Sequence, residues 1–392
     1  MAAWVELGPG GQALARAIVR GPRCPDLALD GVAHEMLLRA APRPSFPERV
    51  CELALPAGAR RARVGRQALP LPNADPRRIV VLGDSGCRLK KKVLQACNDL
   101  EAWPFAEVAA RAADDAPDLV IHVGDYVYRE RECPEDNEGC ASSPFGDRLD
   151  TWVADFFAPA RPLLAAAPWI MARGNHESCQ RAGVGYLRLL DPRPVPPACS
   201  DRTGPYALPL GSRSLVVIDS AGAVDERPSA ADVARARADV AAAPFPGRDP
   251  SWLVSHHPLF GVEVDQKRQG KLRAPGASLR AAADLLPARL ELILSGHIHL
   301  YELIQLVRGP VQAVAGVGGT ELDPEPALTS ERVAAALGVP VSFARARAVF
   351  GYLLLEREAD GVWVADLRDA RGNCTLRCRL EPGGPSCGAL RD

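Results

Sequence analysis

The chain of 392 residues carries 47 basic and 48 acidic side chains, and 47% of its residues are hydrophobic. This composition is ordinary for a packed globular protein and excludes disorder along the whole length. The formal net charge of −1 provides no overall attraction to nucleic acid or to a membrane surface, so we expect neither as a partner. No apolar stretch approaches the roughly 20 residues that a membrane span requires. The length predicts two to three domains.

Residues 1–75 are predicted to form a small all-β sandwich domain of the fibronectin or immunoglobulin kind. Short apolar or alternating runs are separated there by turn sequences such as Gly-Pro-Gly-Gly at 8–11, a spacing that is typical of a sandwich. Three prolines between 70 and 76 then indicate a stiff linker, so the second domain is predicted to span 76–392. The expected strands of the first domain are 4–7, 13–19, 33–38, 50–55 and 63–69.

From residue 78 onward, short apolar runs alternate with Ala-rich, helix-forming stretches. Continuous apolar strands separated by helices are typical of buried sheets covered by helices, so an α/β fold is predicted. The last third, 311–380, is expected to be β-rich again. Strands are expected at 79–82, 119–123, 169–171, 215–218, 252–254 and 290–294, and helices at 89–113, 150–164, 230–243 and 278–285.

Five of the predicted strands end in a small turn that carries metal-capable residues. Because ligands bind at the carboxyl ends of sheet strands, we expect the five turns to converge on one site. A glycine before the ligand lets the backbone turn sharply without a Cβ penalty. Five of the seven histidines lie in these turns, and a metal site explains this better than isolated core histidines do. The turns are Gly83-Asp84-Ser85-Gly86, Gly124-Asp125-Tyr126-Val127-Tyr128, Gly174-Asn175-His176-Glu177, Ser255-His256-His257-Pro258 and Gly296-His297-Ile298-His299.

The order of these motifs resembles that of the purple acid phosphatases, a branch of the calcineurin-like metallophosphoesterases. Asp-x-Gly, Asp-x-x-Tyr, Gly-Asn-His-Glu, a His two residues before Pro, and Gly-His-x-His-x-Tyr-Glu follow one another between residues 78 and 320. The resemblance implies the metallophosphoesterase fold, in which two β-sheets are sandwiched between helices, often behind an all-β N-terminal domain. It also implies a hydrolase of small phosphomonoesters, in which a metal-bound hydroxide attacks phosphate in line. The alternatives are a phosphodiesterase or nucleotide pyrophosphatase with the same centre, or a non-catalytic metal-binding relative.

Carried over residue by residue, the resemblance implies a centre of two metal ions. The first ion is expected to be held by Asp84, Asp125, Tyr128 and His299. The second is expected to be held by Asp125, Asn175, His256 and His297, with Asp125 bridging. Carboxylate and phenolate oxygens favour Fe(III), whereas imidazole and amide suit a divalent Fe, Zn or Mn. Two such ions bind phosphate and lower the pKa of the attacking water.

Two of these ligand positions leave alternatives open. Gly86 stands where ordinary relatives have a His, which leaves the coordination place to Tyr128; otherwise Tyr128 is a strand-end aromatic of the core. Neighbours on an extended strand point to opposite faces, so only one of His256 and His257 is expected to bind metal. The position two residues before Pro favours His256. The register Val-x-x-His fits His257, which therefore stays the alternative ligand and a candidate substrate-binding residue.

His176 is the expected catalytic and substrate-binding residue, because the resemblance places it against the phosphate or its leaving group. An imidazole there stabilises developing charge or donates a proton; the alternative is a histidine that only supports the neighbouring ligand. The family's further His after the His-Pro turn is missing, since no His occurs from 258 to 296. Candidates for its role are Glu263, Asp265, Lys267 and Arg268.

Eleven cysteines in locally spaced pairs indicate an oxidising compartment. The first six residues, Met-Ala-Ala-Trp-Val-Glu, have neither a basic nor an apolar signal region. We therefore expect a secreted or periplasmic protein whose signal peptide has been removed. The expected disulfides join Cys24 to Cys51, Cys87 to Cys97, Cys133 to Cys140, Cys179 to Cys199, and either Cys374 or Cys378 to Cys387.

Overall fold

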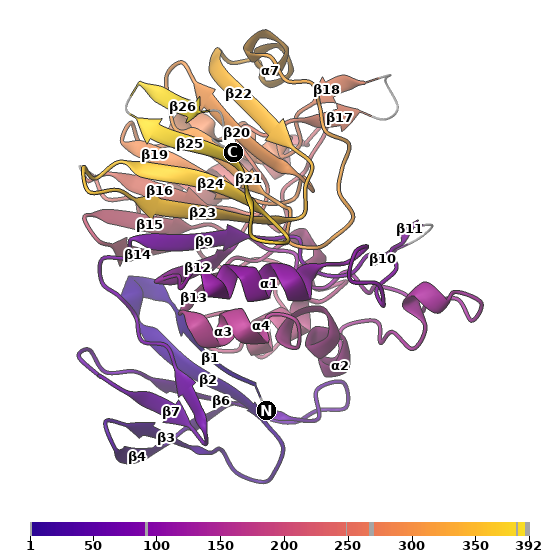
Figure 1. The fold of residues 1–392 in the computed structure, drawn as a ribbon, viewed down its shortest axis with the longest axis vertical. Coiled ribbons are helices and arrows are strands. Elements are labelled where there is room, and N and C mark those ends of the chain that lie inside the picture. Colours follow the sequence, from indigo (N-terminus) through magenta and orange to yellow (C-terminus); the bar gives the residue numbers. More distant parts are fainter. Residues whose placement is uncertain (1, 91–92, 248, 266–269, 382, 389–392) are drawn as a thin grey trace.

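The computed structural model describes residues 2–90, 93–247, 249–265, 270–381 and 383–388. Within these residues, an 11-stranded sheet and a seven-stranded sheet are the largest elements (Figure 1). The larger sheet runs in the order β26 (Gly384–Gly388), β25 (Cys374–Glu381), β24 (Trp363–Asp369), β23 (Gly351–Arg357), β9 (Arg78–Leu82), β12 (Leu119–His122), β13 (Trp169–Met171), β1 (Ala2–Leu7), β2 (Ala13–Val19), β6 (Arg49–Ala54) and β5 (Leu37–Ala40). The smaller sheet runs in the order β14 (Tyr206–Leu210), β15 (Arg213–Val217), β16 (Ser251–Val254), β19 (Leu290–Ser295), β21 (Val311–Ala315), β20 (Tyr301–Leu306) and β22 (Val341–Arg347).

Short sheets and helices complete the described chain. A four-stranded sheet has the order β4 (Val32–Glu35), β3 (Asp26–Leu29), β7 (Ala62–Val64) and β8 (Gln67–Leu69). Two hairpins are β10 (Leu89–Lys90) with β11 (Val93–Leu94), and β17 (Glu263–Asp265) with β18 (Lys271–Arg273). The helices are α1 (Phe105–Asp114), α2 (Leu149–Trp152), α3 (Arg161–Ala166), α4 (Gly183–Leu189), α5 (Ala230–Ala241), α6 (Ala277–Arg280) and α7 (Ser330–Leu337).

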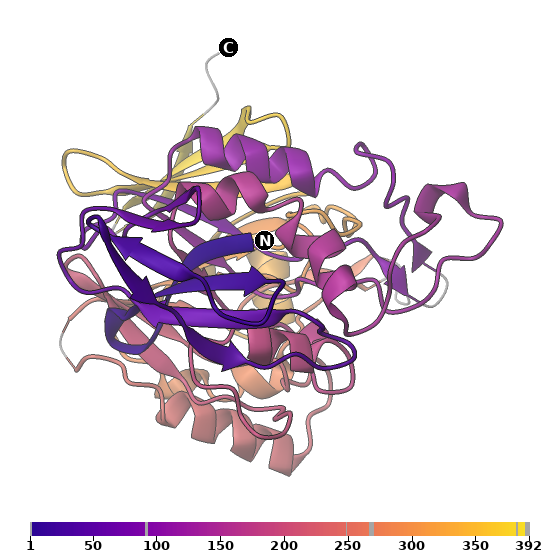
Figure 2. The same ribbon diagram turned by 90° about the horizontal axis from the view of Figure 1, so that it is seen from below.

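The two large sheets pack face to face, and helices cover their outer faces. Apolar side chains of β9 and β12, such as Val81 and Ile121, share one buried core with Val254 and Leu294 of the smaller sheet. The opposite face of the larger sheet packs against α1 and α3, and the opposite face of the smaller sheet against α5 and α7. Seen from below, the helices lie on opposite sides of the strands (Figure 2). The predicted α/β fold with two sheets between helices is confirmed.

Parallel pairing fixes where the site forms. β9, β12 and β13 are parallel neighbours in the larger sheet, and β15, β16, β19 and β21 are parallel neighbours in the smaller one. Their carboxyl ends therefore open at one edge of each sheet, where ligands bind in α/β folds. Each of the five ligand-bearing turns follows one of these strands, as expected.

The N-terminal region is all-β and is continuous with the larger sheet. β1 pairs in parallel with β13, with Glu6 opposite Trp169. The four-stranded sheet packs on the same face of the larger sheet as the seven-stranded sheet does, within the same buried core. The guanidinium of Arg16 is buried on the opposite face of the larger sheet, where it lies 2.5 Å from Glu6 and 2.6 Å from Glu52. It also donates to the carbonyl of Asp191, beyond α4, over 2.6 Å, and so ties this region to the segment that follows α4.

Three of the predicted helices are wrong in extent. The expected helix at 89–113 is a helix only from Phe105, because the Cys87–Cys97 disulfide closes the preceding segment and β10 and β11 form a hairpin within it. The expected helix at 150–164 is split near Pro159 and Pro162, since proline lacks the N–H that a continuing helix needs. The stretch 278–285 divides into α6 and a separate short turn of 3₁₀ helix.

Candidate metal centre

The first group of donor atoms surrounds the hydroxyl of Tyr128. This oxygen lies 2.8 Å from Asp84 Oδ1, 2.8 Å from Asp125 Oδ2 and 3.0 Å from His299 Nε2. The other ring nitrogen of His299 lies 2.9 Å from the carbonyl of Glu321, which holds a proton on Nδ1 and leaves the Nε2 lone pair facing the group. Carboxylate and phenolate oxygens with one imidazole form the hard donor set that suits a trivalent or divalent cation. The four residues expected for the first ion thus lie together.

A second group of donor atoms adjoins the first through Asp125. Nε2 of His256 lies 3.2 Å from Asp125 Oδ2 and 3.0 Å from Asn175 Oδ1, and His297 Nδ1 lies 3.2 Å from the same amide oxygen. His256 Nδ1 is 2.9 Å from the carbonyl of Val123, so its proton is held away from the group. Lone pairs thus face one another in this group, and a cation between them would satisfy them. The donor set fits a second metal ion.

Electrostatics within this cluster reflect the same crowding of lone pairs. Burial alone lowers the pKa of His256, but the Asp125 and Asp84 carboxylates raise it to about 10. Burial also opposes ionisation of Asp125, yet His256 and His176 hold its pKa well below the usual range. Without a cation, a proton on His256 therefore supplies the positive charge that the carboxylates require.

Close backbone approach explains the glycines of these turns. A Cβ at Gly174 would run into Asp125, and one at Gly296 would run into the Asp84 carboxylate. A Cβ at Gly86 would lie 2.6 Å from the carbonyl oxygen of Tyr126 and 2.7 Å from the amide nitrogen of Tyr128. A histidine at position 86 is therefore excluded by the path of the Tyr128 segment.

Backbone strain also gathers at the centre. Asp84, Asp125 and His297 have positive φ angles of 53°, 59° and 71°. Such angles are uncommon for residues with a side chain and persist where the surroundings over-determine the conformation. Buried Glu177 supplies part of that support, because its carboxylate accepts hydrogen bonds from the backbone N–H groups of Asp125 and Gly174, each over 3.0 Å.

His176 lies beside both groups of donor atoms. Its Nε2 is 3.9 Å from Asp125 Oδ2, its ring packs 3.8 Å from that of Tyr128, and its Nδ1 lies 2.8 Å from Glu130 Oε1. Glu130 in turn lies 3.4 Å from Arg181 and 4.0 Å from Lys90. Burial lowers the pKa of His176 to about 4, although Asp125 and Glu130 oppose this shift.

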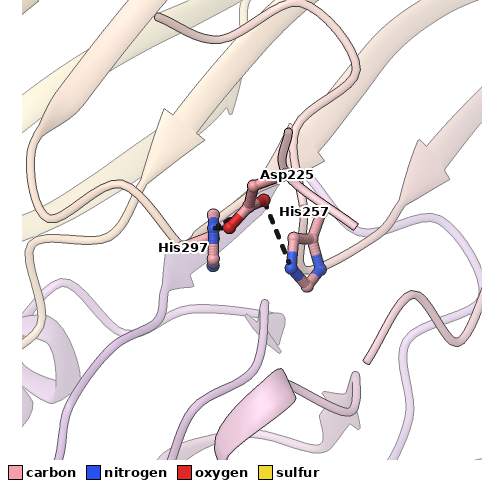
Figure 3. Close-up of side chains that lie close together, drawn as sticks. All are labelled: Asp225, His257 and His297. Atoms are coloured by element: carbon pink, nitrogen blue, oxygen red, sulfur yellow. Dashed lines mark hydrogen bonds and ion pairs between the residues drawn. The ribbon is translucent and has the colours of Figure 1, made fainter. Parts of the chain in front are cut away.

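Glu130 and Asp225 are two carboxylates at the centre that the motifs do not reveal. Asp225 follows β15, the one predicted strand in this parallel series without a ligand-bearing turn, and its Oδ2 lies 3.2 Å from His297 Nε2. His257, the alternative ligand, faces Asp225 at 3.8 Å and packs against the ring of His297 (Figure 3). The geometry therefore favours His256 at the second group of donor atoms.

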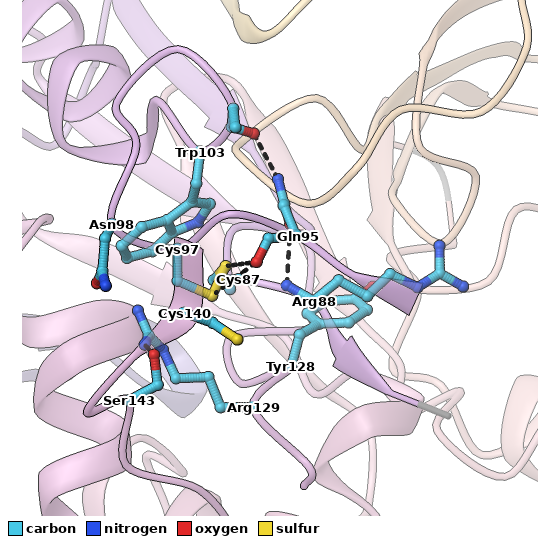
Figure 4. The surroundings of a disulfide bond; sticks show 12 residues. Cys87, Arg88, Gln95, Cys97, Asn98, Trp103, Tyr128, Arg129, Cys140 and Ser143 are labelled. Carbon is cyan, nitrogen blue, oxygen red and sulfur yellow. Dashed lines mark hydrogen bonds between the residues drawn. A yellow bond between two sulfur atoms is a disulfide. The ribbon is translucent and has the colours of Figure 1, made fainter. Parts of the chain in front are cut away.

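Five disulfides join cysteines of the described chain, and one of them adjoins the centre. All four fully specified pairs are confirmed, and Cys378 rather than Cys374 joins Cys387, which leaves Cys374 as a free thiol. The bridge from Cys87 to Cys97 directly follows the first ligand-bearing turn (Figure 4). Trp103, which lies between this bridge and α1, donates to the carbonyl of Ser85 over 2.9 Å. This hydrogen bond helps to fix the first ligand-bearing turn.

Glu263, a candidate for the role of the missing histidine, lies near enough to His297 and Asp225 for their charges to act on its pKa. It lies 2.9 Å from Arg273, and burial raises its pKa to about 7. Asp265 ends the same short strand, β17. Lys267 and Arg268 lie outside the described residues.

The family model of the calcineurin-like phosphoesterases matches residues 77–301, and the chain belongs to this family of metal-dependent phosphoester hydrolases. Among solved structures, its fold is similar to that of purple acid phosphatase PPD1 from seeds of yellow lupin (Lupinus luteus), with a TM-score of 0.62 and 14% identity over 95% of this chain and 72% of that chain. It is also similar to PhoD, with a TM-score of 0.60 and 11% identity over 100% of this chain and 92% of that one. Among curated proteins, none is a significant match in sequence. No helix in the described ranges has the length and apolar character needed to cross a membrane.

Proposed function

We propose that the protein hydrolyses small phosphomonoesters at a centre of two metal ions, Fe(III) and a divalent Fe, Zn or Mn. The observation that best supports two ions is the position of Asp125 Oδ2. This atom lies 2.8 Å from Tyr128 Oη in the first group of donor atoms and 3.2 Å from His256 Nε2 in the second. One carboxylate therefore serves both sites. When bound, the two ions supply Lewis-acid binding of the phosphate oxygens and a water of lowered pKa.

The residues of the chain divide the remaining work. Asp84, Tyr128 and His299 would hold the first ion, and Asn175, His256 and His297 the second. Their rings and carboxylates are packed in place before substrate arrives, so little reorganisation is needed when charge develops on the phosphate.

His176 would act on the substrate from beside this centre. Since burial lowers its pKa to about 4, its ring is neutral near pH 7. Glu130 at 2.8 Å holds the remaining proton on Nδ1, so Nε2 presents a lone pair toward the centre. In this form His176 accepts a hydrogen bond from a phosphate hydroxyl or water, and it acts as a general acid once protonated.

Two measurements test the centre and the reaction. Elemental analysis should find two metal ions per chain, and a visible charge-transfer band should disappear in Tyr128→Phe. A colourless protein that contains iron would refute the phenolate assignment. Rates on p-nitrophenyl phosphate should exceed those on bis(p-nitrophenyl) phosphate; the reverse order would identify a phosphodiesterase instead.

We also propose that the protein works in an oxidising compartment, outside the cell or in the periplasm. The support is the five disulfides, because such bonds persist where thiols are not kept reduced. Titration of the denatured, unreduced chain should detect one thiol, that of Cys374. Ten or eleven thiols would refute this placement.

A further inference from the structure

Asp225 meets the centre at its outer side, away from the shared carboxylate. Its Oδ2 lies 3.2 Å from Nε2 of His297, and its Oδ1 lies 3.8 Å from Nε2 of His257 (Figure 3). The two imidazole rings lie against each other, with their centroids 4.1 Å apart. One carboxylate thus faces two buried or nearly buried histidines.

The two nitrogens of His297 face different partners. Nδ1 lies 3.2 Å from the side-chain oxygen of Asn175, in the second group of donor atoms, whereas Nε2 faces Asp225. A neutral imidazole carries one proton, and a carboxylate at Nε2 keeps that proton there. The lone pair of Nδ1 is then directed at the place where a second ion would bind.

Asp225 is itself held in position by the segment that starts α6. The N–H of Gly276 donates to Asp225 Oδ1 over 3.0 Å, and the N–H of Ala277 donates to its backbone carbonyl over 3.3 Å. Its neighbour Val224 donates to the hydroxyl of Ser278 over 2.8 Å. The carboxylate is therefore fixed by elements outside the metal centre, and its place does not depend on His297.

We propose that Asp225 is a positioning residue for the second metal ion: it fixes the tautomer and the ring orientation of His297. This inference rests on the proposed two-metal function and deepens it. Carboxylates that support a ligating histidine in this way are worth about 10- to 100-fold in metal affinity. Among the histidines of the centre that the structure describes, Asp225 contacts His297 and His257. Of these, His297 is the expected ligand of the second ion, so loss of Asp225 should change the affinity for that ion alone.

The same atoms suggest one competing arrangement, in which Asp225, His257 and His297 hold an ion of their own. Their donor atoms lie within 4.8 Å of one another. However, His297 would then need to bind metal through Nε2 as well as through Nδ1, which requires loss of both ring protons. The hydrogen-bonded arrangement needs no such loss, and stoichiometry separates the two.

The test is a zinc titration of the metal-free, full-length protein by calorimetry, with bound zinc counted by elemental analysis. The variant is Asp225→Asn, whose amide oxygen still accepts from Gly276, and the matched control is Glu226→Gln, which removes a neighbouring charge paired with Arg273. We expect two zinc ions in the wild type and in the control. Asp225→Asn should bind the first zinc with unchanged affinity and the second with a Kd raised about 10- to 100-fold.

Each outcome has a distinct meaning. Equal binding of both zinc ions by Asp225→Asn and the wild type would overturn the inference, and so would three zinc ions in the wild type with two in the variant. A wild type that binds no zinc, iron or manganese would instead refute the proposed function.

A second variant, Asp225→Glu, keeps the charge and covers the case in which Asp225→Asn does not fold. It should bind the second zinc more tightly than Asp225→Asn does. Where Asp225→Asn cannot be measured, the second zinc should bind to Asp225→Glu within about 10-fold of the wild-type affinity, because a carboxylate still faces His297. A weaker second site in the Asp225→Glu variant would count against the inference.

Discussion

Replacing Gly86 by alanine tests whether the absence of a side chain there is what allows Tyr128 to reach the centre. The added Cβ would lie 2.6 Å from the carbonyl oxygen of Tyr126, about 0.8 Å closer than the 3.4 Å at which ordinary van der Waals contact begins. Its second neighbour, the amide nitrogen of Tyr128, lies at 2.7 Å. Both obstacles are backbone atoms, so neither can rotate away.

The backbone of Tyr128 must therefore move by a sizeable fraction of an ångström. Its N–H donates to the buried carboxylate of Asp155 over 2.9 Å, and its hydroxyl lies 2.8 Å from Asp84 and from Asp125, so the shift disturbs both ends of the residue. Overpacking of this kind costs about 1–3 kcal/mol of unfolding free energy. Misplacement of a group at a reacting centre by about 1 Å lowers turnover on the order of 100-fold.

The assay combines urea unfolding, metal content and kcat on p-nitrophenyl phosphate. Gly222→Ala is the matched control, because a Cβ at Gly222 meets nothing within 4 Å. We expect the control to match the wild type, and Gly86→Ala to lose affinity for one metal ion, to shift the visible band and to lose turnover. A Gly86→Ala protein with two metal ions, an unshifted band and wild-type kcat would refute this reasoning.

Three further predictions follow from contacts described above. Zinc binding to the metal-free protein at pH 7 should release about two protons per chain, one from His256, whose pKa is raised to about 10 in the absence of metal, and one from the Tyr128 hydroxyl, whose pKa burial raises above its usual range. Calorimetry in buffers of different ionisation enthalpy measures the release, and no buffer dependence would contradict it. Arg16→Met should cost about 3–5 kcal/mol in urea unfolding, because it leaves Glu6 buried and unpaired. Burial raises the pKa of Glu6 to about 8 even beside Arg16, and loss of Arg16 raises it further, so Glu6 keeps its proton in both folded proteins up to about pH 8. The loss should therefore be nearly constant from about pH 5 to pH 7 and grow above about pH 8; a loss that does not grow above about pH 8 would exclude this cause. Glu130→Gln should lower kcat about 10-fold with little change in metal content, because it loosens the hold on His176, whereas the exposed neighbour variant Glu132→Gln should have no effect.

The five ligand-bearing turns were predictable because each follows a short, buried, parallel strand, and such strands appear in the sequence as continuous apolar runs. The short sequence of each turn sets the direction of its side chains. Asp84, Asn175 and His297 therefore lie together, as expected. The glycines act in two ways: Gly124 has a φ of 104°, as the expected sharp turn requires, whereas others serve close packing. Gly174 has an ordinary φ of −97°, and its value lies in letting Asp125 approach closely.

Glu130 and Asp225 were not predictable, because each stands in an irregular loop and its role is set by a partner far away in sequence. Asp219 is the first carboxylate after β15, but it pairs with Arg173 at 3.4 Å. A prediction from distance to the strand end would therefore have chosen Asp219 and missed Asp225. The continuity of β1 with β13 was hidden for a similar reason. Strand pairing across more than 150 residues leaves no local pattern.

The proposed metal pockets draw their donors from both large sheets. Asp84 and Asp125 follow strands of the 11-stranded sheet, whereas His256 and His299 follow strands of the seven-stranded sheet. Ions bound there would crosslink two sheets that share no backbone hydrogen bonds with each other among the described strands. Because a ligand that binds only the assembled state stabilises it by RT ln(1 + [L]/Kd), the sheets would resist sliding apart more strongly as free metal rises. The free concentration of metal would then set the free energy of unfolding of the two packed sheets as well as the activity.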